Sequence, residues 1–183
     1  IAGWVRKGDL AAVVDRSAGI DSIGDLKGKK LALFAASPFL PFLDTFLKAG
    51  GLTRDDVNLL YVEPSAMMMT YTSGQADGVL TAGPYGQALA ERDRPASLVL
   101  AEEAGISYPS YGYFSTEAVI TEKEEVLRRF IATQTRAFQY LYDGHVDEGV
   151  AAIISQRPDL KLDPEILKNQ IELYRPFFTT PNT

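Results

Sequence analysis

Three short apolar runs alternate with helix-forming segments in residues 19–85, which read GIDSIGDLKGKKLALFAASPFLPFLDTFLKAGGLTRDDVNLLYVEPSAMMMTYTSGQADGVLTAGPY. The runs cover residues 31–36, 57–62 and 78–82, and each is bounded by Gly, Pro or polar residues, as strands are. Since the runs alternate with helical patterns, we expect them to be neighbouring strands of one largely parallel α/β sheet. Residues 97–101 are expected to form a fourth strand of the same block.

The second half of the chain has a different character. Residues 108–116 are rich in Tyr and Ser and are expected to be extended. Thr121 and Glu124 have the spacing of a capping box that starts a long helix, Asp147 is expected to cap another, and Asp163-Pro164 to open the last. A helical tail after an α/β block predicts two lobes.

Composition excludes several classes of function. The 183 residues carry a net charge of −6 without a basic stripe, which argues against a nucleic-acid partner. With no Cys and one His, the chain has no thiolate metal site, cysteine nucleophile or paired-histidine zinc site. His145 lies in a polar turn far from every candidate serine, so no catalytic triad is expected. We therefore expect a protein that is not an enzyme and needs no cofactor or metal.

Four segments resemble one protein family in their order and spacing. They are residues 25–29 (DLKGK), 73–78 (SGQADG), 83–85 (GPY) and 110–113 (SYGY). Together they resemble the periplasmic substrate-binding proteins of ABC importers, in the branch that binds thiamine-pyrimidine precursors, sulfonates, taurine and nitrate.

The resemblance implies a type 2 periplasmic-binding fold: two α/β lobes, with mainly parallel sheet, joined by two crossing strands. Residues 1–19 would hold part of lobe 1 and a hinge strand, 20–107 lobe 2, and 108–183 the return strand and the helical part of lobe 1. Residues 10–15 and 111–116 would then be the crossing strands and lie side by side. Since the N-terminal part of lobe 1 has no counterpart, and the chain ends are IAGWVRKG and PFFTTPNT, we expect a piece of a longer protein. A periplasmic location, a membrane permease as partner and a monomeric state are further expectations.

In an open α/β sheet, ligands bind outside the carboxyl ends of the strands. That rule selects the segments 36–41, 63–66, 82–86 and 107–113. The candidate ligand-binding residues in them are Ser37, Phe39, Glu63, Ser65, Gly83, Tyr85 and Tyr111. Plainer alternatives stay open: Ser37 as a helix cap, Phe39 as a core residue and Glu63 as a solvated carboxylate.

The chemistry of these segments favours one class of solute. They contain no Lys or Arg, whereas most anion sites use a cation. A planar ring with amino groups, such as a thiamine-precursor-like aminopyrimidine, fits better: it could stack on a tyrosine and donate to Glu63. Sulfonate, taurine or nitrate remain alternative ligands. A pyrimidine-precursor synthase of the same fold and a ligand-sensing domain remain alternative functions.

Overall fold

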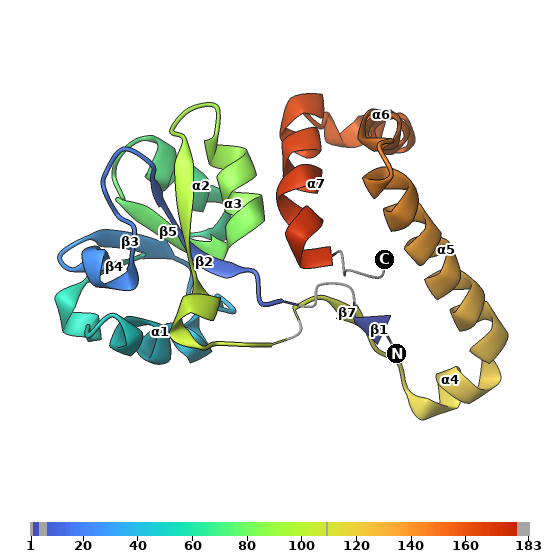
Figure 1. The fold of residues 1–183 in the computed structure, drawn as a ribbon, viewed down its shortest axis with the longest axis horizontal. Helices are drawn as coiled ribbons and strands as arrows, with labels where there is room; N and C mark the ends of the chain where they lie inside the picture. Colours follow the sequence, from blue (N-terminus) through green and yellow to red (C-terminus); the bar gives the residue numbers. More distant parts are fainter. Residues whose placement is uncertain (1, 4–6, 109, 179–183) are drawn as a thin grey trace. The chain divides into compact units, whose positions relative to one another are not determined.

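The computed structural model describes residues 2–3, 7–108 and 110–178 (Figure 1). The chain divides into two compact units. Unit 2 is Lys7–Tyr108, and unit 1 comprises Ile1–Arg6 and Pro109–Thr183. The expected boundary near residue 107 agrees with this division, whereas the one near residue 20 is wrong, because residues 10–15 belong to the sheet of unit 2.

Unit 2 contains a five-stranded sheet in the order β4-β3-β5-β2-β6. The prediction that residues 31–36, 57–62 and 78–82 form neighbouring parallel strands is confirmed, because β3 pairs in parallel with both β4 and β5. The strand β2 is antiparallel to both its neighbours, β5 and β6, so the other four strands all run in one direction. The bounds are β2 (Leu10–Asp15), β3 (Lys30–Leu33), β4 (Asn58–Tyr61), β5 (Gly78–Ala82) and β6 (Ala96–Leu100).

Helices cover both faces of this sheet because its central strands are apolar on both faces. On one face, Leu31 and Leu33 pack with the α1 residues Phe46 and Leu47 in one cluster. On the other face, Ala32 packs in a second cluster that contains residues of α2 and α3. The helices are α1 (Leu43–Ala49), α2 (Met67–Thr72) and α3 (Gly83–Ala90), joined by the 3-10 turns η1 (Ile23–Leu26), η2 (Leu40–Phe42), η3 (Arg54–Asp56), η4 (Pro64–Ala66) and η5 (Ala101–Ala104).

The expected pair of crossing strands is wrong. Residues 10–15 form β2, which lies between β5 and β6, and not beside residues 111–116. Its side chains from Leu10 to Val14 are all buried, which requires a sheet neighbour on each side and a helix layer on each face. Of residues 111–116, only β7 (Gly112–Tyr113) is a strand, and it pairs antiparallel with β1 (Ala2–Gly3) in unit 1.

Unit 1 is otherwise helical, with α4 (Glu117–Glu122), α5 (Glu124–Tyr142), α6 (Val146–Gln156), the 3-10 turn η6 (Pro158–Leu160) and α7 (Pro164–Phe178). Three predicted helix starts have different outcomes. Thr121 lies inside α4, whose N-cap is Thr116, so the expected capping box is wrong. The cap position of α6 is His145 and not Asp147. Asp163 accepts hydrogen bonds from the N–H groups of the first turn of α7, as predicted.

Apolar side chains of α6 and α7 form the interior of unit 1. Val146, Val150, Tyr174 and Phe177 are buried, and Phe138 of α5 stacks on Phe178 with ring centroids 4.6 Å apart. Within the described ranges, no helix has the length and apolar character needed to cross a membrane.

Candidate functional site

An open depression lies at the carboxyl ends of β3 and β4. Its volume is about 460 Å³, and it is lined by Phe34, Ala35, Ala36, Tyr61, Val62, Glu63 and Pro64. The first three residues follow β3 directly, and the others end or follow β4. Because β3 and β4 are parallel, both loops start at one edge of the sheet, where the ligands of open α/β sheets bind.

Local backbone structure presents Glu63 at this edge. The Val62 N–H donates to the Leu33 carbonyl at 2.9 Å, which continues the β3–β4 pairing to the mouth of the depression. Pro64 then starts η4, so that the chain turns immediately after Glu63. The carboxylate is exposed, and no cation of the described residues pairs with it.

The lining combines two aromatic side chains with one carboxylate. Tyr61 is 56% exposed and Phe34 is half-buried, and the lining contains no Lys or Arg. A surface of this kind can stack a flat ring and accept hydrogen bonds from its amino groups. It offers an anion no cationic side chain.

Ser37 and Phe39 belong to the loop after β3 but face the interior. Ser37 is 3% exposed, and its hydroxyl accepts the Phe39 N–H at 3.2 Å. Phe39 is fully buried and meets Phe46 edge-to-face with ring centroids 5.1 Å apart. The alternative of a helix cap for Ser37 is wrong, because the N-cap position of η2 is Phe39, whereas the alternative of a core position for Phe39 is confirmed.

The remaining candidates are spread over other elements. Ser65 is exposed in η4, close in sequence to Glu63, and Tyr85 is 42% exposed in the first turn of α3. Gly83 is buried, and a Cβ there would lie 2.9 Å from the Ala11 Cβ, so this glycine permits the close approach of α3 to β2. Tyr111 is 55% exposed and belongs to unit 1. Glu63 is the one predicted residue that lines the depression.

Tyr61 and Phe34, which form the aromatic part of the lining, are not among the residues predicted from the sequence. Both lie inside or directly beside predicted strands, whereas candidates were sought in the loops. Tyr61 ends the edge strand β4, in which Asn58 and Tyr61 are exposed. A large aromatic residue at the end of an edge strand is the signal that could have identified it.

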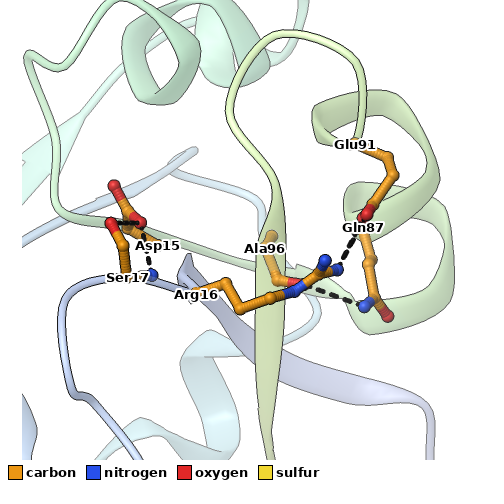
Figure 2. A network of polar contacts seen from close by, with 6 residues as sticks. All are labelled: Asp15, Arg16, Ser17, Gln87, Glu91 and Ala96. Atoms are coloured by element: carbon orange, nitrogen blue, oxygen red, sulfur yellow. Dashed lines mark hydrogen bonds and ion pairs between the residues drawn. The ribbon is translucent and has the colours of Figure 1, made fainter.

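The opposite edge of the sheet carries charged side chains in structural roles (Figure 2). Arg16 donates to both carboxylate oxygens of Glu91, at 2.8 and 2.9 Å, and to the Ala96 carbonyl at 3.0 Å. Asp15 accepts from the Ser17 hydroxyl and from Arg94, and these hydrogen bonds lower the pKa of Asp15 to about 2. Within the described residues, no cluster of His, Cys, Asp and Glu could hold a metal ion.

Solved structures that share this fold include binding proteins and an enzyme. The periplasmic aliphatic sulphonate binding protein SsuA from Escherichia coli matches with a TM-score of 0.70 and 16% identity, over 93% of this chain and 55% of its own. The alkanesulfonate-binding protein SsuA from Xanthomonas axonopodis pv. citri, bound to MOPS, matches with a TM-score of 0.60 and 20% identity, over 98% and 61%. The enzyme DSZB in complex with biphenyl-2-sulfinic acid matches with a TM-score of 0.52 and 15% identity, over 92% and 61%.

These identities show a shared fold and leave the function open. The chain spans between 55% and 61% of the length of these three proteins. No curated protein matches the sequence. A family model described as NMT1/THI5 like matches residues 1–145 of the 183. The chain has the fold of periplasmic binding proteins and belongs to the NMT1/THI5-like family.

Proposed function

We propose that this protein is the solute-binding component of an ABC importer and that it captures a small organic molecule for a membrane permease. The observation that carries the proposal is the depression at the carboxyl ends of β3 and β4, which is lined by Phe34, Tyr61 and Glu63. The shared fold with SsuA proteins supports it. A location outside the cytoplasm and a monomeric state are parts of the same proposal.

The lining favours a planar nitrogen-containing ring, such as an aminopyrimidine. Glu63 would accept a hydrogen bond from an exocyclic amino group, and Tyr61 would stack on the ring. Tyr85 and Tyr111 are exposed and remain proposed contributors to stacking, and Ser65 to hydrogen bonding. A charge-assisted hydrogen bond to Glu63 is stronger than a neutral one, so this carboxylate should contribute much of the selectivity.

A sulfonate is the second candidate, because the two SsuA proteins are named for sulfonate binding. Backbone N–H groups could hold such an anion, but Glu63 in the lining would repel it. An enzymatic function has weaker support. The fold is shared with DSZB, but this chain has no Cys, and its His145 lies between α5 and α6 in unit 1.

Isothermal titration calorimetry with an aminopyrimidine and with taurine distinguishes the two ligand classes. We expect the aminopyrimidine to bind and Glu63→Gln to weaken its binding by about 1–3 kcal/mol, the cost of losing a charged hydrogen bond. The matched control is Glu91→Gln, because Glu91 lies on α3's C-terminal side and pairs with Arg16 at the opposite edge of the sheet. Tight taurine binding that is indifferent to Glu63→Gln would refute the proposed ligand class.

A further inference from the structure

The two ends of unit 2 are joined by one side chain. Unit 2 begins at Lys7 and ends at Tyr108. The Tyr108 hydroxyl accepts the Leu10 N–H at 3.2 Å and lies 3.4 Å from Asp9 Oδ1, to which it donates. Asp9 and Leu10 are 2% and 3% exposed, so these contacts lie inside the unit.

The backbone at Gly8 is shaped for the Tyr108 ring. A Cβ at residue 8 would lie 2.5 Å from Cε1 of Tyr108, closer than side chains approach one another. Only glycine therefore lets the ring lie against the chain at this point. The same segment is also fixed to α3, because the Asp9 carbonyl accepts the Gly83 N–H at 2.6 Å.

The Tyr108 ring also contacts the loop that lines the depression. We call residues 34–42 the pocket loop. Phe42, its last residue, stacks on Tyr108 with ring centroids 5.3 Å apart and an interplanar angle of 14°. Three backbone hydrogen bonds lie within the loop. The Ser37 N–H donates to the Phe34 carbonyl, the Leu40 N–H to the Ser37 carbonyl and the Phe42 N–H to the Phe39 carbonyl. These hydrogen bonds span the loop from Phe34 to Phe42.

We propose that Tyr108 is a positioning residue that couples the pocket loop to the segment through which the chain enters unit 2. The Tyr108 ring stacks on Phe42, and the Tyr108 hydroxyl makes hydrogen bonds with Asp9 and with the Leu10 N–H. A solute that presses on the pocket loop therefore acts on both chain connections of unit 2 through one side chain. The role of the loop in solute binding rests on the proposed function, whereas the coupling itself is a property of the free protein.

Amide hydrogen exchange measured by NMR on the whole chain, without ligand, tests the coupling. Tyr108→Phe keeps the ring and removes the hydroxyl, so it should raise the exchange rate of the Leu10 amide about tenfold and leave the Phe42 amide within about twofold. Tyr108→Leu removes both contacts and should raise both rates. The amide of Ala32 in the central strand β3 reports global opening, so its change in each variant measures the loss of global stability.

Tyr71→Phe is the matched control, because it removes a buried tyrosine hydroxyl that has no hydrogen-bond partner within the described residues. It should leave the Leu10 and Phe42 amides unchanged. The proposal is overturned if Leu10 exchange is unchanged in Tyr108→Phe, if Phe42 exchange is unchanged in Tyr108→Leu, or if Phe42 exchange rises as much as Leu10 exchange in Tyr108→Phe. Because no solute is present, these outcomes are independent of whether the aminopyrimidine binds.

Discussion

The Arg94 side chain joins three parts of unit 2, and its replacement gives the sharpest test of how this unit is held together. Its guanidinium donates to Asp15 Oδ2 at 2.9 Å, to the Tyr71 carbonyl at 2.8 Å and to the Ala76 carbonyl at 2.7 Å. Its Cζ also lies 4.6 Å from the centroid of the Tyr71 ring. These contacts link the end of β2, the end of α2 and the turn before β5.

The expected cost of Arg94→Met follows from these contacts. Both partners of the ion pair have side chains that are 21% exposed, so the pair is largely shielded from water. The substitution removes the donor of the Tyr71 and Ala76 carbonyl groups and the cation beside Asp15, whose carboxylate still accepts from Ser17. Unpaired groups of this kind cost about 1–3 kcal/mol each, and breaking a buried pair costs about 3–5 kcal/mol in total. Allowing for partial access of water, we expect a loss of about 3 kcal/mol in the free energy of unfolding.

Thermal unfolding followed by circular dichroism measures this loss. About 3 kcal/mol in a unit of roughly 100 residues lowers Tm by about 10–20 °C. The matched control is Arg16→Met at the same edge of the sheet (Figure 2), where the ion pair with Glu91 is 54% and 36% exposed. We expect that control to cost about 1 kcal/mol or less. If the two variants have Tm values within about 3 °C of each other, the burial argument for Arg94 is wrong.

Two further predictions concern groups in contact with Arg94. The pKa of Asp15 is lowered from 3.8 to about 2, first by the Ser17 hydroxyl and then by Arg94, so its contribution is complete above pH 3.8 and is lost as the pH falls through 2. Urea unfolding between pH 5 and 2 should show a loss of about 1–2 kcal/mol in the wild type that Asp15→Asn lacks, and equal pH dependence in both would contradict this. Tyr71→Phe should stabilise the protein by up to about 1 kcal/mol, since the buried Tyr71 hydroxyl has no partner in the described part of the chain. A lower urea midpoint for that variant would show that the hydroxyl makes a stabilising hydrogen bond.

The sequence was sufficient for the parallel part of the sheet. The runs that became β3, β4 and β5 are short, apolar and separated by helical patterns, and right-handed connections of that kind produce neighbouring parallel strands. The sequence was insufficient to predict that β2 lies inside the same sheet. The segment LAAVVD is apolar at consecutive positions, which is the mark of a strand buried on both faces, but the two-lobe arrangement implied by the family resemblance assigned it to a crossing strand. Burial on both faces of the sheet depends on tertiary packing, and it places this segment inside the sheet of unit 2.

The site was predicted in part for a related reason. The rule that ligands bind at the carboxyl ends of strands located the segments around Glu63 and Ala36, which line the depression. It could not tell which side chains of those segments face outward. Phe39 lies between Pro38 and Pro41 in a run of turns that directs its ring into the core against Phe46. Such a reversal within three residues depends on packing and has no periodic signal in the sequence.

The reversed direction of β2 also explains why the chain enters and leaves unit 2 at the edge of the sheet that carries the depression. Because β2 is antiparallel to β5 and β6, its first residue, Leu10, pairs with Ala82 at the carboxyl end of β5. The chain therefore enters unit 2 at the edge that carries the depression, and it leaves at the same edge through Tyr108. A parallel β2 would have placed its first residue at the opposite edge, beside the network of Arg16 and Arg94. The topology thus places the network of Arg16 and Arg94 at one edge of the sheet and the depression at the other, where no cation of the described residues pairs with Glu63.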